Sequence, residues 1–124
     1  MKTLMMLLMM LLPIPALAQV TGPCAELSKE VLALETATTD LAAKFRVIDD
    51  QYQYYQYMLY LGRLIVDQFP QDERTLQIYH DYQYDVSTYW YYTWRPAKIA
   101  WLESADKLAA KNRLLDECFE ANHD

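Results

Sequence analysis

Few residues of this sequence have the types and spacing needed for chemistry. Two cysteines, Cys24 and Cys118, could form a disulfide, hold a metal ion or supply a nucleophilic thiol. The histidines are His80 and His123, and no second histidine is spaced to complete a metal site with either of them. Glu120 and His123 have the E-x-x-H spacing of di-iron bundles, but such a site needs this motif on two helices. The sequence therefore predicts no metal site and no cofactor.

The hydroxyl and carboxylate side chains are not arranged for catalysis. Each serine lies inside a helical pattern, without a nucleophile elbow and without a nearby histidine. Carboxylate pairs such as Asp49 with Asp50 lie on charged helices, where they are usually solvated. Two glycines in 124 residues leave little material for a phosphate-binding loop. We therefore expect a protein that is not an enzyme.

The charge balance limits the partners. The chain has 17 acidic and 11 basic side chains, a formal net charge of −6. This excludes nucleic acid as a partner, because binding phosphates needs a basic surface. The polar faces also lack the lysines and arginines that anionic lipids attract. An acidic surface instead favours a basic protein partner, whose approach it would steer.

The N-terminus has the features of a secretory signal peptide. Lys2 is followed by an unbroken run of Leu and Met over 4–12, and Ala16–Ala18 has the small-x-small pattern of a cleavage site. Nine apolar residues are too few to span a bilayer, so we expect no stable membrane anchor. We expect export to a bacterial periplasm. The predicted organisation is a cleaved signal peptide over 1–18, a short extended segment over 19–23, one helical domain over 24–120 and a frayed C-terminus over 121–124.

The apolar spacing predicts a helical hairpin. A 4-3 pattern runs from Leu27 to Phe69 and predicts one long helix with a single seam. Pro70 then ends this helix, and a second helical pattern follows it. The first helix could break at Thr36–Asp40, because threonine and aspartate favour the N-cap position at which a new helix begins. Pro96 interrupts the second pattern and predicts a kink or a third helix.

A chain that folds back near residue 71 fixes which residues face each other. The turn is placed by Pro70, not by the cysteines, yet this register puts Cys24 opposite Cys118. We therefore expect a Cys24–Cys118 disulfide that closes the open end of the hairpin in an oxidising compartment. The same register puts His80 opposite Gly62, where an imidazole would fill the gap.

A hairpin of two helices buries only one stripe of each, which is too little core for independent stability. The predicted fold is therefore all-α, a long antiparallel helical hairpin folded or paired into a small helix bundle and closed by a terminal disulfide. Bends at Thr38–Asp40 and Pro96 would give a compact three- or four-helix bundle, which we prefer. Pairing with a second copy would instead give a homodimeric four-helix bundle.

All eleven tyrosines fall between residues 52 and 92. Because adjacent helical residues point about 100° apart, the tyrosines cannot all lie in the seam. We expect the inward-facing rings to include Tyr52, Tyr55, Tyr79 and Trp90, which would pack the core. The tyrosines expected on the surface are chiefly Tyr54, Tyr57, Tyr84, Tyr91 and Tyr92.

Surface tyrosines interleaved with acidic residues are typical of a protein-binding face, although ordinary core and surface would explain them equally well. The carboxylates expected beside them are Asp49, Asp50, Asp81 and Asp85. The predicted function is a periplasmic, non-enzymatic inhibitor or immunity-type protein that neutralises a basic, cell-wall-acting hydrolase or toxin. One alternative is a glycan- or peptidoglycan-binding module that stacks sugars on Trp94 and Trp101. Another is a structural subunit of an envelope complex.

Overall fold

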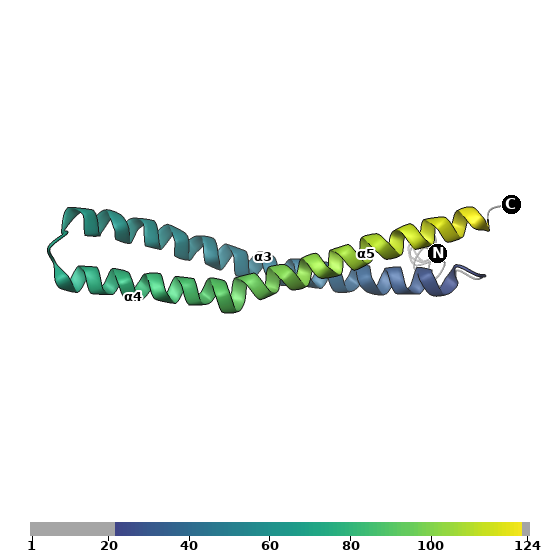
Figure 1. The fold of residues 1–124 in the computed structure, drawn as a ribbon, viewed down its shortest axis with the longest axis horizontal. Coiled ribbons are helices and arrows are strands. Elements are labelled where there is room, and N and C mark those ends of the chain that lie inside the picture. Colours follow the sequence, from purple (N-terminus) through teal and green to yellow (C-terminus); the bar gives the residue numbers. More distant parts are fainter. Residues whose placement is uncertain (1–21, 123–124) are drawn as a thin grey trace, which may run out of the picture. The chain divides into compact units, whose positions relative to one another are not determined.

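The computed structural model describes residues 22–122. The predicted signal peptide, its cleavage site, residues 19–21 and His123 lie outside the described residues. Within 22–122 every element is helical: α3 (Ala25–Gln68), α4 (Glu73–Tyr89), the π-helix η1 (Trp90–Trp94) and α5 (Arg95–Ala121) (Figure 1). Two long helical segments pack together, which confirms the predicted all-α hairpin. Contacts divide it into two units, one made of 22–37 with 104–122 and the other of 38–103.

The seam predicted for the first helix is confirmed. Every seam position from Leu27 to Val66 is buried or half-buried. Phe69 was expected to continue the seam, and this prediction is wrong, since its side chain is 57% exposed. The reason is that α3 ends at Gln68, so Phe69 belongs to the turn.

The expected break at Thr36–Asp40 does not occur, because α3 is continuous across these residues. The Thr36 hydroxyl donates a hydrogen bond to the backbone carbonyl of Leu32, at 3.1 Å. A threonine bonded in this way remains within the helix instead of capping a new one. Leu34, Thr38 and Leu41 keep the seam half-buried through the segment.

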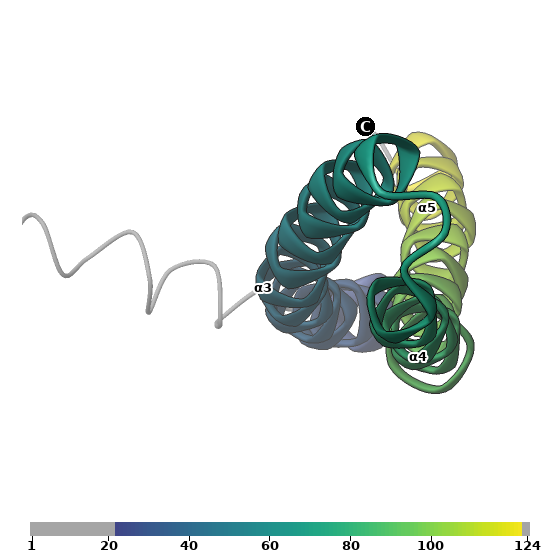
Figure 2. The ribbon, with the colours of Figure 1, turned by 90° about the vertical axis from the view of Figure 1, so that its left-hand side faces the viewer.

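Asp72 is the N-cap residue of the second helix. Its carboxylate accepts hydrogen bonds from the backbone N–H of Arg74 at 3.1 Å and of Thr75 at 3.4 Å. The Thr75 hydroxyl donates to the other carboxylate oxygen at 3.0 Å. These bonds satisfy N–H groups that the first helical turn leaves unpaired. Pro70 lies in the connection between the ends of α3 and α4 (Figure 2).

The shift of pattern near Pro96 comes from the π-helix η1 and not from a break. The N–H of Arg95 bonds to the carbonyl of Trp90, five residues earlier, so this turn holds one residue more than an α-helical turn. The chain stays helical from Glu73 to Ala121. Neither expected bend interrupts a helix. Each unit, over its described residues, contains two helical segments.

The first unit contains the predicted disulfide. The Sγ atoms of Cys24 and Cys118 are 2.10 Å apart and their Cα atoms 5.9 Å apart. Cys24 and Val31 are buried beside α5 residues of the same unit. Lys111 forms a salt bridge with Glu30 across the two helices. The disulfide therefore joins the beginning of α3 to the end of α5, as the register predicts.

The second unit has a thin core. Val86 is its one buried hydrophobic side chain among the described residues, and no described side chain is less than 2% exposed. Half-buried aromatic rings contribute to its packing, as in the contacts of Phe45 with Trp94 and Trp101.

Candidate protein-binding surface

The two tryptophans proposed for glycan stacking belong to the packing of the second unit. Phe45 stacks on Trp101 with ring centroids 5.4 Å apart, and meets Trp94 edge-on at 5.5 Å. Tyr52 lies 5.6 Å from the Trp94 ring. The Trp94 indole N–H donates to the Asp49 carboxylate at 2.9 Å. Both rings are half-buried, and this placement gives no support to a sugar-stacking role.

The inner tyrosines have their hydroxyls bound within the hairpin. The Tyr82 hydroxyl donates to the carbonyl of Tyr55 at 3.4 Å, and the Tyr89 hydroxyl to the carbonyl of Ile48 at 3.3 Å. The Tyr55 ring meets the Tyr89 ring edge-on at 5.1 Å. Tyr82 and Tyr89 are inner residues that the sequence analysis did not assign. Each precedes by one residue a position at which the second helical pattern repeats, Gln83 and Trp90.

Of the four rings expected inside, three are confirmed and one is wrong. Tyr52, Tyr55 and Tyr79 are half-buried. Trp90 is 36% exposed and reaches the surface. Its ring nevertheless stacks on that of Trp94, with the centroids 6.1 Å apart, so it lies at the edge of the aromatic packing.

Burial raises the pKa of Tyr82 above its ordinary value of about 10, and the phenols of Tyr54 and Tyr55 raise it further. Burial followed by the Tyr55 phenol raises the pKa of Tyr89 in the same direction. A raised folded-state pKa stabilises the fold below the unfolded pKa, and this stabilisation is lost as pH rises. We therefore expect the free energy of unfolding to fall above about pH 10.

The measurement is urea unfolding at several pH values for the wild type and for Tyr82→Phe with Tyr89→Phe. The double variant should lose less stability between neutral and strongly alkaline pH. Tyr84→Phe, which removes an exposed hydroxyl, controls for the loss of a phenol. Equal alkaline losses in the wild type and the double variant would contradict the burial of these two phenols.

The five tyrosines expected on the surface are between 52% and 73% exposed. Over residues 22–122, none of their hydroxyls hydrogen-bonds to another protein group. These residues are Tyr54, Tyr57, Tyr84, Tyr91 and Tyr92. Tyr60, which the sequence analysis left unassigned, is also 59% exposed. The helical spacing could have identified it, since Tyr60 follows the seam residue Leu59 by one position.

The structure does not place the exposed tyrosines on one face. A groove of about 220 Å³ on one side of the second unit is lined by residues that include Gln56, Ser87 and Trp90. Tyr60 lies four residues after Gln56, and Tyr84 three before Ser87, so both occupy helical positions next to residues that line this groove, although neither ring lines it. We call its surroundings the tyrosine side, defined by Tyr60, Tyr84 and Tyr91.

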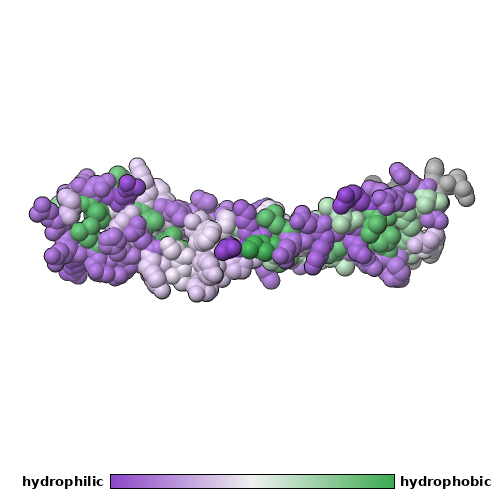
Figure 3. All heavy atoms as spheres, viewed as in Figure 1, coloured by the Kyte–Doolittle hydropathy of each residue, from purple (hydrophilic) through white to green (hydrophobic). Residues whose placement is uncertain are grey.

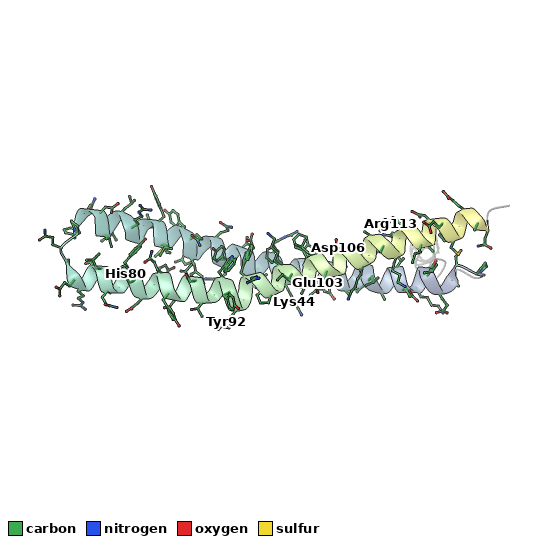
Figure 4. All side chains as sticks on the ribbon, viewed as in Figure 1. Lys44, His80, Tyr92, Glu103, Asp106 and Arg113 are labelled. Carbon is green, nitrogen blue, oxygen red and sulfur yellow. A yellow bond between two sulfur atoms is a disulfide. The ribbon has the colours of Figure 1, made fainter. Side chains whose placement is uncertain are left out.

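The remaining exposed tyrosines lie elsewhere on the second unit. Tyr54 lies four residues before Met58, which lines a separate groove on the opposite side of the seam. Tyr57 lies between these two sides, on the outer surface of α3. Figure 4 shows Tyr92 at the surface of η1. The tyrosines predicted to share one face are therefore divided among several surfaces.

The four predicted carboxylates also differ in their roles. Asp49 is half-buried and bound to the Trp94 indole, so it fixes a ring of the core. Asp81 is exposed and accepts a hydrogen bond from the Gln77 amide at 2.9 Å. Asp50 and Asp85 are exposed. Three of the four are therefore at the surface, where they can act on an approaching partner.

A cluster around η1 was missed by the sequence analysis. The Arg95 guanidinium lies 5.9 Å from the centroid of the Trp90 ring and 5.7 Å from that of Tyr91. The Tyr91 and Tyr92 rings meet edge-on at 4.9 Å. The aromatic run over 90–94 was the available signal, but the π-helical turn that brings Arg95 under two rings has no known sequence signature. This cation extends the tyrosine side beyond Tyr91.

His80 does not fill the gap at Gly62, so this prediction is wrong. A Cβ atom added at Gly62 would lie 3.2 Å from Cδ2 of Tyr79, which occupies that space. His80 is exposed, with its Nδ1 3.1 Å from the Gln83 side-chain oxygen. The seam predicted Tyr79 as an inner residue, and the facing register is displaced by one residue near the turn.

Neither a metal site nor a membrane span is found in the described part of the chain. Residues 22–122 contain no group of three or more His, Cys, Asp or Glu side chains that could hold a metal ion. None of the helices described is both long enough and apolar enough to cross a bilayer.

The fold and surface define a disulfide-closed antiparallel helical hairpin with exposed tyrosines on its second unit. Comparison with known proteins found no matching family model, no similar curated protein and no similar solved structure.

Proposed function

We propose that this protein is a periplasmic, non-enzymatic binding factor of the inhibitor or immunity type. It binds and neutralises a basic, cell-wall-acting hydrolase or toxin. One observation carries the proposal: the outer tyrosines are more than half exposed and their hydroxyls are free of protein partners, whereas Tyr82 and Tyr89 donate to backbone carbonyls. Exposed phenols offer contact area and hydrogen bonds at low cost in rotamer entropy.

The tyrosine side is the proposed centre of the interface. Tyr60 and Tyr84 are on opposite helices, each next to a residue that lines the groove, and we infer that a partner seated over the groove contacts both rings. Asp81 lies three residues before Tyr84 and is exposed on the neighbouring helical position. With a net charge of −6, the chain attracts a basic partner before contact. Tyr57 and Asp50 extend the interface over the outer surface of α3.

Two features support export to the periplasm as the compartment. The first eighteen residues have the charge, apolar run and cleavage pattern of an exported protein. The Cys24–Cys118 disulfide supports the same assignment, because such bonds persist in oxidising compartments. The disulfide also removes both thiols as nucleophiles, which supports a role in binding instead of catalysis.

Replacing Tyr60 and Tyr84 by Ala is expected to abolish partner binding while changing the free energy of unfolding by no more than about 0.5 kcal/mol each. The physical reason is that both rings are exposed and free of internal hydrogen bonds. Thermal unfolding and binding are measured on the same samples. Tyr82→Ala is the matched control, because it removes an inner ring and should lower the melting temperature. A large loss of stability in the double variant would show that these rings belong to the core.

The partner is tested with immobilised protein and envelope extract. The wild type should retain a basic protein in stoichiometric amount, and the Tyr60→Ala/Tyr84→Ala variant should not. The retained protein should digest purified cell-wall sacculi, and added wild type should stop this digestion. Tyr57→Ala should weaken retention less than the double variant. Direct retention of the chain on sacculi that carry no protein would instead support the glycan-binding alternative.

A further inference from the structure

The second unit carries a second apolar pattern outside its seam. On α3 the residues Val47, Tyr54, Met58, Leu61 and Ile65 follow each other at helical spacing, with Gln51 between the first two. On α4 the corresponding residues are Ile78, Tyr82 and Tyr89. We call these eight residues the apolar stripe. None of them is a predicted seam residue, and the stripe runs beside the seam, with Tyr82 and Tyr89 half-buried at its edge and Ile78 exposed.

The two halves of the apolar stripe lie on the same side of the hairpin. A groove of about 380 Å³ is lined from α3 by Met58 and Ile65 and from α4 by Ile78 and Tyr82. A neighbouring groove continues from Tyr82 to Tyr89. Figure 3 shows apolar atoms reaching the surface between α3 and α4 near the turn. The stripe is therefore one continuous surface that belongs to both helices.

This pattern is typical of a helix with two neighbours. A helix that packs against a single partner buries one narrow seam, whereas a bundle helix adds a further apolar position beside it. In the second unit, no third described helix covers the apolar stripe, because the unit consists of two helical segments. Val47, Tyr54, Ile65 and Ile78 accordingly remain 50–71% exposed.

The exposed area approaches what a dimer requires. Large side chains each present on the order of 150–250 Å², so the exposed fractions of the stripe leave roughly 600 Å² of apolar surface. This is near the upper end of the ~300–600 Å² patches of monomeric proteins. It is also close to the ~800 Å² that each partner buries in a standard dimer. Covering the stripe would also thicken a core in which Val86 is the one buried hydrophobic residue of the unit.

Charge identifies the occupant as a second copy. In a chain with a net charge of −6, repulsion between copies is least at a surface with few carboxylates. The stripe follows one helical spacing over 47–65 on α3 and over 75–89 on α4. Among the residues at that spacing, Asp85 is the one with a charged side chain. On α3, the side across the seam from the apolar stripe carries Asp49, Arg63 and Asp67. A basic partner gains little from an uncharged surface, whereas a two-fold dimer matches the stripe to itself.

We propose that two copies of this chain pair through the apolar stripe, so that their second units form a four-helix bundle. The tyrosine side lies across the seam from the stripe and remains free in the pair. Tyr54 is then a dimer contact, while Tyr60 and Tyr84 stay available to the partner. The pairing is independent of the proposed inhibitor function.

The test is the mass of the mature protein by sedimentation over a range of concentrations. The wild type should sediment as a dimer, and Ile65→Glu should raise the dimer dissociation constant at least about tenfold, because each dimer would bury two unpaired carboxylates. Leu64→Glu is the matched control, since Leu64 is 44% exposed against 50% for Ile65 but faces away from the stripe. It should leave the dimer intact. A wild type that is monomeric at every concentration, or equal effects of the two variants, would overturn the proposal.

A second measurement does not depend on the variants. If the wild type pairs, its melting temperature should rise with protein concentration, because only the folded chain associates. A melting temperature that is independent of concentration would count against pairing. Tyr60→Ala with Tyr84→Ala should sediment like the wild type, so loss of partner binding and loss of the dimer are separable.

Discussion

Replacing Cys24 and Cys118 by Ser is expected to lower the free energy of unfolding by about 4–5 kcal/mol. The two cysteines are separated by 94 residues in sequence, and cross-linking so long a loop removes much of the entropy of the unfolded chain. This loss equals a large part of the stability of a typical small domain. Because few side chains are buried, packing cannot compensate for it.

The measurement is urea unfolding followed by circular dichroism, with the wild type compared with the double variant. Mass spectrometry of the non-reduced protein supplies the control, since the bonded form is two mass units lighter than the dithiol. The reduced wild type should lose the same stability as the variant. Unchanged stability in both would mean that the hairpin is held by contacts other than the disulfide.

Phe45→Ala is expected to lower the free energy of unfolding by about 2–4 kcal/mol. Phe45 is the ring that both Trp94 and Trp101 contact, at 5.5 Å and 5.4 Å between centroids. Its removal therefore breaks two aromatic pairs and leaves a cavity in the core of the second unit. The expected loss is below that of a fully enclosed phenylalanine because Phe45 is half-buried.

Phe69→Ala is the matched control for Phe45→Ala. It deletes the same side chain in the turn, where the ring is 57% exposed, and should change the free energy of unfolding by less than about 0.5 kcal/mol. Tryptophan fluorescence gives a second readout, because only the loss of Phe45 should change the surroundings of Trp94 and Trp101. Equal destabilisation by both substitutions would contradict the assignment of Phe45 to the core.

The helical hairpin could be predicted because its information is local and repetitive. Leu27 to Val66 keep one spacing over forty residues, Pro70 ends it, and Asp72 has the side chain that caps the next helix. The Cys24–Cys118 pairing followed from the position of the turn alone. The continuity of α3 through Thr36–Asp40 was not predictable, because the capping tendency of these residues competes with a seam whose strength depends on the facing helix.

The candidate surface could be predicted in part. The helical spacing of residues predicted that Tyr54, Tyr57 and Tyr84 point away from the seam, and all three side chains are exposed. It could not show that they occupy different sides, because this depends on where the second helix packs. The indole bond of Asp49 and the position of Arg95 also depend on contacts and on a π-helical turn that no residue spacing encodes.

The π-helix η1 has a consequence for changes in chain length. Because its turn contains one extra residue, it is equivalent to a one-residue insertion that the helix has absorbed without changing which way its later residues point. Deleting one residue between Trp90 and Trp94 would convert the turn to α-helix and leave Trp101 directed at Phe45. A deletion in the middle of α4 would instead rotate the residues after it by about 100° and move their rings out of the seam. The chain can therefore change its length at this point while keeping its packing.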